Sequence, residues 1–150
     1  MFVARSALYK GDAQWNTSIL TSQSESSKRF TQVYNNLGYG FLEKVYKNAM
    51  VIELRKLGLS AIPEARINVY YDGELVGEYL ADLVVADAVI VELKAAKKLA
   101  EEHEAQLLNY LKATPYEVGL LLHFGPQPEI KRKAFDNSRK GSMRWIGKSA

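Results

Sequence analysis

Apolar and polar residues recur with two different periods along the chain, and the changes of period predict its elements. Over residues 24–37 and 41–57 apolar side chains return every three to four positions, which predicts two amphipathic helices. Residues 61–94 alternate and are rich in β-branched side chains, with a strong turn signal at Asp72-Gly73, which predicts three antiparallel strands.

The pattern changes back after these strands. Residues 100–114 have helical periodicity, and Pro115 marks the end of that helix. The run EVGLLLHFG, residues 117–125, is continuously apolar, as in a strand buried on both faces, and a short basic element follows it. The order α-α-β-β-β-α-β predicts an α/β fold with a mixed sheet flanked by helices.

Three segments follow from this pattern. Residues 1–23 show no sustained periodicity and form an N-terminal arm without a predicted structure. Residues 24–136 carry the periodic elements and form the predicted folded domain, and residues 137–150 form a basic C-terminal tail.

Composition narrows the chemistry. The chain has 150 residues, a net charge of +3 and no cysteine, which excludes disulfides, thiolate zinc sites and cysteine nucleophiles. No apolar run reaches the roughly 18 residues that a membrane helix needs, so we expect a cytoplasmic protein without membrane contact. The short LGYGF segment follows no predicted strand, which argues against a nucleotide cofactor.

Basic residues gather towards the C-terminal end. Such a distribution either binds a polyanion such as a nucleic acid or only keeps the surface solvated. The basic residues there are Lys131, Arg132, Lys133, Arg139, Lys140, Arg144 and Lys148.

Three charges interrupt the apolar strands of the central hairpin: Asp82, Glu92 and Lys94. A two-residue loop at Ala86-Asp87 would turn Asp82 to the face opposite Glu92, whereas a three-residue loop ending at Ala88 or a bulge would bring the two carboxylates together. Two adjacent carboxylates favour a hard divalent cation, Mg²⁺ or Mn²⁺, and Lys94 would then assist phosphoester chemistry. The other interpretation is the exposed end of an ordinary hairpin.

Further polar residues fall on the neighbouring helices. Glu43 interrupts the predicted apolar stripe at the start of the second helix, and Gln106 and Tyr110 lie one turn apart on the helix after Lys94. We interpret His103 as a helix-surface residue and His123 as a packed strand residue rather than as metal ligands. The tyrosines of the strands, and Tyr46, suit packing.

Taken in chain order, Gly-x-x-Glu, Asp, Glu-x-Lys and Gln-x-x-x-Tyr resemble the PD-(D/E)xK nuclease superfamily, in particular its RecB-like branch and the small standalone GxxExxxR family. The resemblance covers about residues 26–135 and implies a restriction-endonuclease-like core. Lys47 stands where the GxxExxxR family has its arginine, and Ala81 where the superfamily name has proline.

The resemblance also implies roles. Glu43, Asp82 and Glu92 match the acids that hold the metal ion, and Lys94 matches the catalytic lysine. Gln106 and Tyr110 match the pair that positions the phosphate. Candidate contacts to nucleic acid are Lys47, Lys97, Lys98, Lys131, Arg132 and Lys133.

These observations predict a Mg²⁺- or Mn²⁺-dependent nuclease, with DNA as the favoured substrate and a homodimer as the simplest way to cut both strands of a duplex. The alternative is a nucleic-acid-binding or assembly protein that has a nuclease fold and little or no activity. A purely structural domain is the third interpretation.

Overall fold

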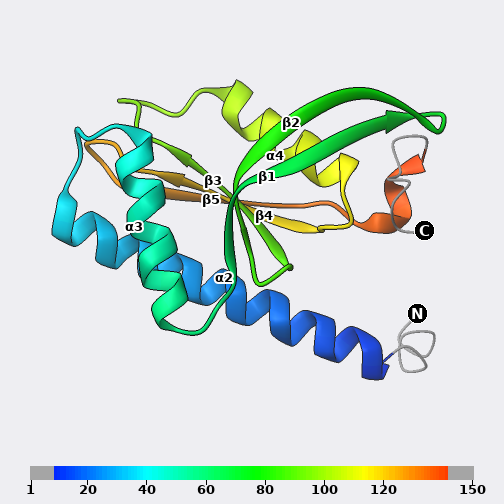
Figure 1. Ribbon diagram of the computed structural model, residues 1–150, viewed down its shortest axis with the longest axis horizontal. Helices are drawn as coiled ribbons and strands as arrows, with labels where there is room; N and C mark the ends of the chain where they lie inside the picture. The colour runs from blue at the N-terminus through cyan, green and yellow to red at the C-terminus, as the bar shows by residue number, and fades with distance from the viewer. Residues whose placement is uncertain (1–8, 142–150) are drawn as a thin grey trace.

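A five-stranded mixed sheet with strand order β1-β2-β3-β4-β5 forms the centre of the computed structural model, which describes residues 9–141 (Figure 1). Strands β1 to β3 are antiparallel, β3 and β4 are parallel, and β5 is antiparallel to β4. The strands are β1 (Ala61–Tyr71), β2 (Glu74–Val85), β3 (Val89–Lys94), β4 (Val118–His123) and β5 (Glu129–Ala134). The helices are α2 (Tyr9–Leu37), α3 (Glu43–Lys56), α4 (Glu101–Ala113) and the short 3₁₀ helix η1 (Asn137–Arg139).

The predicted fold class and element order are therefore confirmed. The parallel pair β3 and β4 requires a crossover, which α4 supplies. The basic element after β4 forms the edge strand β5, which the sequence pattern had left without a secondary structure.

Helices cover both faces of the sheet, and each face has its own apolar core. Helices α2 and α3 contribute Phe30, Tyr46 and Met50 to one core, together with Leu83 and Val91 of the sheet. Helix α4 contributes to the other core on the opposite face, where Leu107 and Leu111 pack against Ala81, Ile90 and Leu121.

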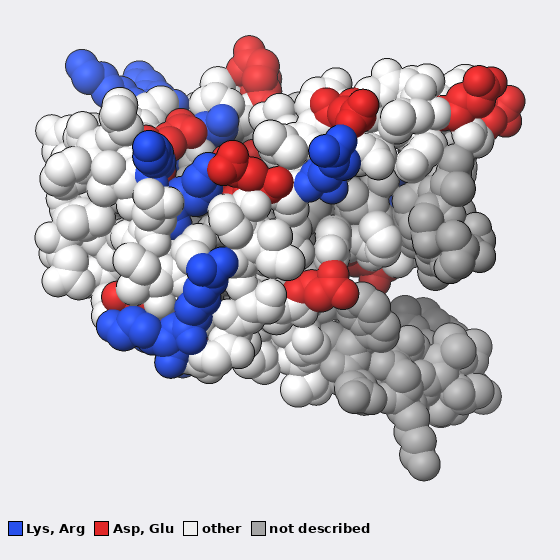
Figure 2. All heavy atoms as spheres, in the orientation of Figure 1, with Lys and Arg blue, Asp and Glu red and all other residues white. Residues whose placement is uncertain are grey.

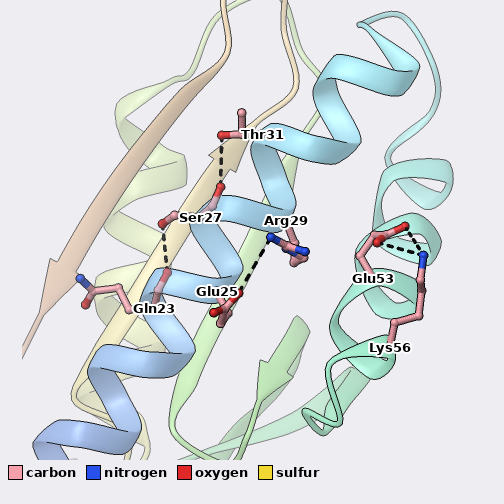
Figure 3. Close-up of polar contacts among 7 residues, drawn as sticks. All are labelled: Gln23, Glu25, Ser27, Arg29, Thr31, Glu53 and Lys56. Carbon is pink, nitrogen blue, oxygen red and sulfur yellow. Dashed lines mark hydrogen bonds and ion pairs between the residues drawn. The ribbon is translucent and has the colours of Figure 1, made fainter.

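Helix α2 is much longer than its sequence pattern predicted, because it begins at Tyr9 rather than near residue 24. Its polar stretch still buries one side, because Ile19, Ser22 and Ser26 recur every three to four residues and are all buried. The Ser27 hydroxyl donates to the Gln23 carbonyl at 3.0 Å, and Arg29 lies 4.0 Å from Glu25 (Figure 3).

The predicted apolar stripe of α3 was wrong at its first turn. Leu42 and Val45 are exposed, and Glu43, the first residue of the helix, is exposed rather than buried. The buried stripe begins at Tyr46, because only the later turns of α3 lie over the sheet. A carboxylate at a helix N-terminus is favourable, since it faces the positive end of the helix dipole.

Both hairpin turns use left-handed backbone. Asp72 and Gly73 have φ of 51° and 83°, as the Asp-Gly signal predicted. The β2–β3 loop has three residues, Ala86 to Ala88, because Val85 pairs with Val89. In the described part of the chain no helix has the length and apolar character needed to cross a membrane.

Candidate active site

The three-residue loop determines where the acids of the central hairpin lie. The pairing of β2 with β3 runs from the loop to Leu83 opposite Val91, so that Asp82 and Glu92 are the next residues on the two strands. The backbone N–H of Asp82 donates to Glu92 Oε2 at 2.6 Å, and the N–H of Leu93 donates to Asp82 Oδ2 at 2.8 Å. The alternative two-residue loop, which would have separated the acids, does not form.

Both carboxyl groups are harder to ionise than a free carboxyl. Burial is the main cause that raises the pKa of Glu92 to about 8, and the negative charge of Asp82 adds to it. Burial also raises the pKa of Asp82, although the hydrogen bond from Leu93 and the charge of Lys94 oppose this shift. Both acids therefore favour their neutral form more than a free carboxyl does, and a bound cation would shift them back towards the ionised form.

Glu43 reaches the same region from α3. Its Oε2 lies 3.4 Å from the backbone N–H of Ala95, one residue after Lys94. Its charge contributes to the raised pKa of both Asp82 and Glu92. A small pocket beside α3 is lined by Glu43, Lys44, Lys47, Asp82 and Leu93.

Lys47 and Lys94 bring positive charge to the acids. Both lower the pKa of Asp82, and Lys94 also lowers that of Glu92. Lys47 Nζ lies 4.0 Å from Glu64 Oε1. Lys94 is the last residue of β3 and is half-buried, so that its backbone position is fixed by the central strands.

Gln106 and Tyr110 lie on α4, over the opposite face of the sheet from α3. Gln106 Nε2 donates to the Tyr110 hydroxyl at 2.9 Å, as their spacing of one turn predicts. The pKa of Tyr110 is raised to about 12 by burial and then by the charges of Glu92 and Asp82. The pair therefore lies within the electrostatic field of the hairpin acids.

The carboxylates are not arranged as a finished cation site. Among the side chains that the structure describes, within residues 17–141, no three of Asp, Glu, His or Cys lie so that together they could hold a metal ion. Asp82 and Glu92 each accept a backbone N–H instead. Their chemistry fits a hard cation, because carboxylate oxygens are the preferred ligands of Mg²⁺.

Only some of the basic residues proposed to contact nucleic acid lie together: Lys97, Lys98 and Lys131 line one pocket. Over the face shown in Figure 2, Lys and Arg side chains lie in separate places, with Asp and Glu side chains among them. Lys97 and Lys98 are exposed in the β3–α4 loop. On β5, Lys131 lies 3.2 Å from Glu129 and Lys133 lies 2.8 Å from Glu104 of α4. Arg132 is on the other face of the strand, where its Nε donates to Gln23 Oε1 of α2 at 2.8 Å.

Near the end of the described chain, a buried lysine stabilises the fold. Lys140 is buried, and its Nζ donates to the carbonyls of Thr114 and Tyr116 at 2.5 and 2.9 Å. Arg139 lies over the ring of Phe135, with its Cζ 4.4 Å from the ring centre. The rest of the predicted basic tail, with Arg144 and Lys148, lies outside the described residues.

Both histidines bond to nearby main-chain groups. His103 Nδ1 accepts the backbone N–H of Ala100 at 3.2 Å, so that it caps the start of α4. His123 is buried in β4, as predicted. Among the tyrosines, Tyr46 is fully buried, whereas Tyr79 is half exposed, with its ring centre 5.8 Å from that of Tyr110.

Sequence reasoning missed Glu64. It interrupts the pairing of β1 with β2 beside Asp82, and its φ of 53° is left-handed. A non-glycine residue rarely adopts this conformation inside a strand, and no pattern of residue types marks it in the sequence. Its side chain supplies the carboxylate nearest to Lys47.

Comparisons with known proteins agree with this fold. A family model described as the PD-(D/E)XK nuclease superfamily matches residues 22–133. The crystal structure of SSO0001 matches with a TM-score of 0.50 and 17% sequence identity. That match covers 63% of this chain and 52% of SSO0001, so that this chain spans about half the length of that structure. At this identity the likeness shows the fold alone, and it supports the restriction-endonuclease-like architecture. None of the curated proteins matches the sequence.

Proposed function

Because the chain belongs to the PD-(D/E)XK nuclease superfamily, whose members are usually nucleases, we propose that it hydrolyses phosphodiester bonds in nucleic acid with the help of Mg²⁺ or Mn²⁺. The observation that carries this proposal is the pair Asp82 and Glu92. Two carboxylates held together at the end of the central hairpin, one of them with a pKa of about 8, are costly for folding, and a bound cation would remove that cost. We propose DNA as the substrate.

Each residue has a proposed task. Glu43, Asp82 and Glu92 would hold the cation, after the last two turn away from the main-chain groups that they now bond. The cation, when bound, would supply Lewis-acid stabilisation of the phosphate oxygens. Lys94 would stabilise the negative charge that develops on the reacting phosphate, and Gln106 with Tyr110 would orient that phosphate.

We also propose the finer relationship to the RecB-like branch and the GxxExxxR family. Three features support it: Glu43 follows Gly40 by three residues at the start of α3, Gln106 and Tyr110 are bonded, and Lys47 keeps a positive charge beside Asp82. We propose residues 24–136 as the functional domain. A homodimer would let two such sites act on the two strands of a duplex.

One observation favours the alternative, a nucleic-acid-binding protein without activity: within residues 17–141 the acids are not already arranged around a cation. A cleavage assay decides between the two. Labelled linear, circular, flapped and branched DNA, and the matching RNA, are incubated with Mg²⁺, Mn²⁺ or EDTA, using the wild type and Asp82→Ala. Cleavage that needs both the cation and Asp82 supports the nuclease, whereas salt-dependent binding without cleavage of any substrate supports the alternative.

A further inference from the structure

A second pocket opens next to the candidate active site, between the β3–α4 loop and the β4–β5 turn. Its volume is about 410 Å³, within the usual range for ligand sites. Three lysines, two glutamates and a buried histidine are among its lining residues: Lys97, Lys98, Lys131, Glu104, Glu129 and His123.

The pocket has positive charge that its own acids do not neutralise. Glu129 is paired with Lys131 at 3.2 Å, and Glu104 is paired with Lys133 at 2.8 Å. Lys97 and Lys98 are exposed and form no ion pair with any residue of the described chain. These two lysine side chains therefore remain available at the rim of the pocket, which favours an anion as the ligand.

His123, which lines the pocket, has a polar atom without a hydrogen-bond partner. It is 4% exposed, and its Nε2 lies 2.6 Å from the carbonyl oxygen of Ala96. Because a carbonyl only accepts, Nε2 must carry the proton, which leaves Nδ1 as a buried lone pair without a partner. A buried acceptor of this kind is able to take a hydrogen bond from a donor that reaches it.

Glycine allows the chain to close around this ring. A Cβ at Gly125 would lie 2.5 Å from His123 Nε2 and 2.8 Å from the Ala96 carbonyl oxygen, which is too close for any other residue type. The Tyr34 hydroxyl also donates to the Gly125 carbonyl at 2.5 Å and anchors the turn to α2. The imidazole is thus held in one position rather than packed loosely.

The pocket is one strand away from the proposed chemistry. His123 is the register partner of Lys94 on the parallel strand β4, and neighbouring strands are about 4.8 Å apart. The N–H of Phe124 donates to the Lys94 carbonyl at 2.7 Å, which holds the two strand ends together. A nucleic-acid strand with its reacting phosphate at Lys94 would therefore bring another phosphate of the same strand close to the pocket.

Resting on the proposed nuclease function, we propose that this pocket binds the terminal phosphate of a nucleic-acid strand, so that the protein recognises phosphorylated ends. The unpaired Nδ1 favours a terminal monoester over an internal diester. A phosphate monoester has a second pKa near 6, close to that of imidazole, so that one proton is available to join the two groups. A diester has no such proton, and it can bond to Nδ1 only when the imidazole is already charged.

The test measures binding without metal, so that cleavage plays no part. Fluorescence anisotropy compares one short single-stranded DNA carrying a 5′ phosphate, a 3′ phosphate or hydroxyls at both ends, with the protein in EDTA. We expect one phosphorylated form to bind about tenfold more tightly than the hydroxyl form, the gain expected of a hydrogen bond to a charged group. Whichever of the two phosphorylated forms gains identifies the end that is recognised.

Variants tie the preference to the pocket. The double change Lys97→Ala with Lys98→Ala, and separately His123→Gln, should abolish the preference, since glutamine can still donate to Ala96 but offers no ring nitrogen. Lys56→Ala, which removes an exposed lysine of α3, is the control and should keep it. If His123→Gln does not fold, ¹⁵N NMR of the wild type replaces it: added inorganic phosphate should shift the His123 Nδ1 resonance in the wild type and not in the lysine double variant.

Equal affinity for all three DNA forms would overturn the proposal, and so would an unshifted His123 resonance. If the lysine changes lower the affinity for all three DNA forms equally, the pocket binds internal diesters and the proposal is also overturned. These results are independent of catalysis. A preference for phosphorylated ends without any cleavage would refute the nuclease function and support the end-binding pocket. Metal-dependent cleavage without an end preference would support the nuclease function and refute the end-binding pocket.

Discussion

Replacing Glu92 by glutamine should stabilise the metal-free protein at alkaline pH. The change removes the charge of a buried carboxyl that has its pKa raised to about 8 by burial and by Asp82. It leaves an oxygen that can accept the N–H of Asp82, the bond that Glu92 makes at 2.6 Å. The site would lose its costly charge but keep its hydrogen bond.

The direction follows from the pKa in each state. In the unfolded chain this carboxyl has its ordinary pKa of 4.5, so between pH 4.5 and 8 the unfolded state has released a proton that the folded state still holds. The wild type should therefore lose stability as pH rises through this window. At roughly 1.4 kcal/mol for each unit of pKa difference, the stability of Glu92→Gln relative to the wild type should rise by about 3 kcal/mol between pH 5 and pH 8.

Thermal and urea unfolding in EDTA measure this difference. For a chain of this size about 3 kcal/mol corresponds to a shift in Tm on the order of 10 °C. Glu74→Gln is the matched control, because Glu74 is exposed directly after the Asp72-Gly73 turn and its change should give a pH profile parallel to that of the wild type. If the stability of Glu92→Gln falls with pH as steeply as that of the wild type, the Glu92 carboxyl is already ionised in the folded protein and its pKa is not raised.

Three further outcomes are expected. Mg²⁺ or Mn²⁺ should raise the Tm of the wild type, because a metal concentration of one hundred times Kd adds about 2.7 kcal/mol to the free energy of unfolding. Asp82→Ala should largely remove that rise in Tm, and an unchanged rise would place the cation elsewhere. Lys94→Ala should keep the metal-induced rise in Tm but lower single-turnover cleavage by on the order of a hundredfold, and wild-type rates in this variant would remove Lys94 from the chemistry. Lys131→Ala should weaken nucleic-acid binding and flatten its salt dependence, whereas Arg132→Ala should change binding little, because Arg132 faces α2; the reverse order would move the nucleic acid to the α2 face.

The order of elements could be predicted from the sequence because each one has a strong local signal. The strands alternate, Asp72-Gly73 provides the two left-handed residues that its turn needs, and the run over β4 is apolar on both faces. Helix α2 could not be predicted to its full length, because the side that it buries there includes Ser22 and Ser26, and polar residues at buried positions hide the helical period. The exposed start of α3 was missed for a related reason, since apolar residues such as Leu42 also occur on surfaces.

The candidate site was predictable as residue types but not as geometry. Spacing alone placed Glu92 beside Lys94 and Gln106 beside Tyr110. Whether Asp82 joined them depended on one extra residue in the β2–β3 loop, and Ala86-Asp87-Ala88 carries no glycine that would have marked it. The grouping of basic residues was the least predictable feature, because Lys131 and Arg132 are adjacent in sequence yet lie on opposite faces of β5.

The structure explains how the hairpin core tolerates its charges. Asp82 and Glu92 accept main-chain N–H groups of the opposite strand, so that neither carboxylate is buried without a partner. These bonds offset only part of the burial cost, because the pKa of both acids remains raised. A fold that needed only structural polar residues here would be more stable with neutral side chains. The acids and Lys94 are therefore best explained by a task that needs charge at the end of the hairpin, and that is the reason to test the chain first as an enzyme.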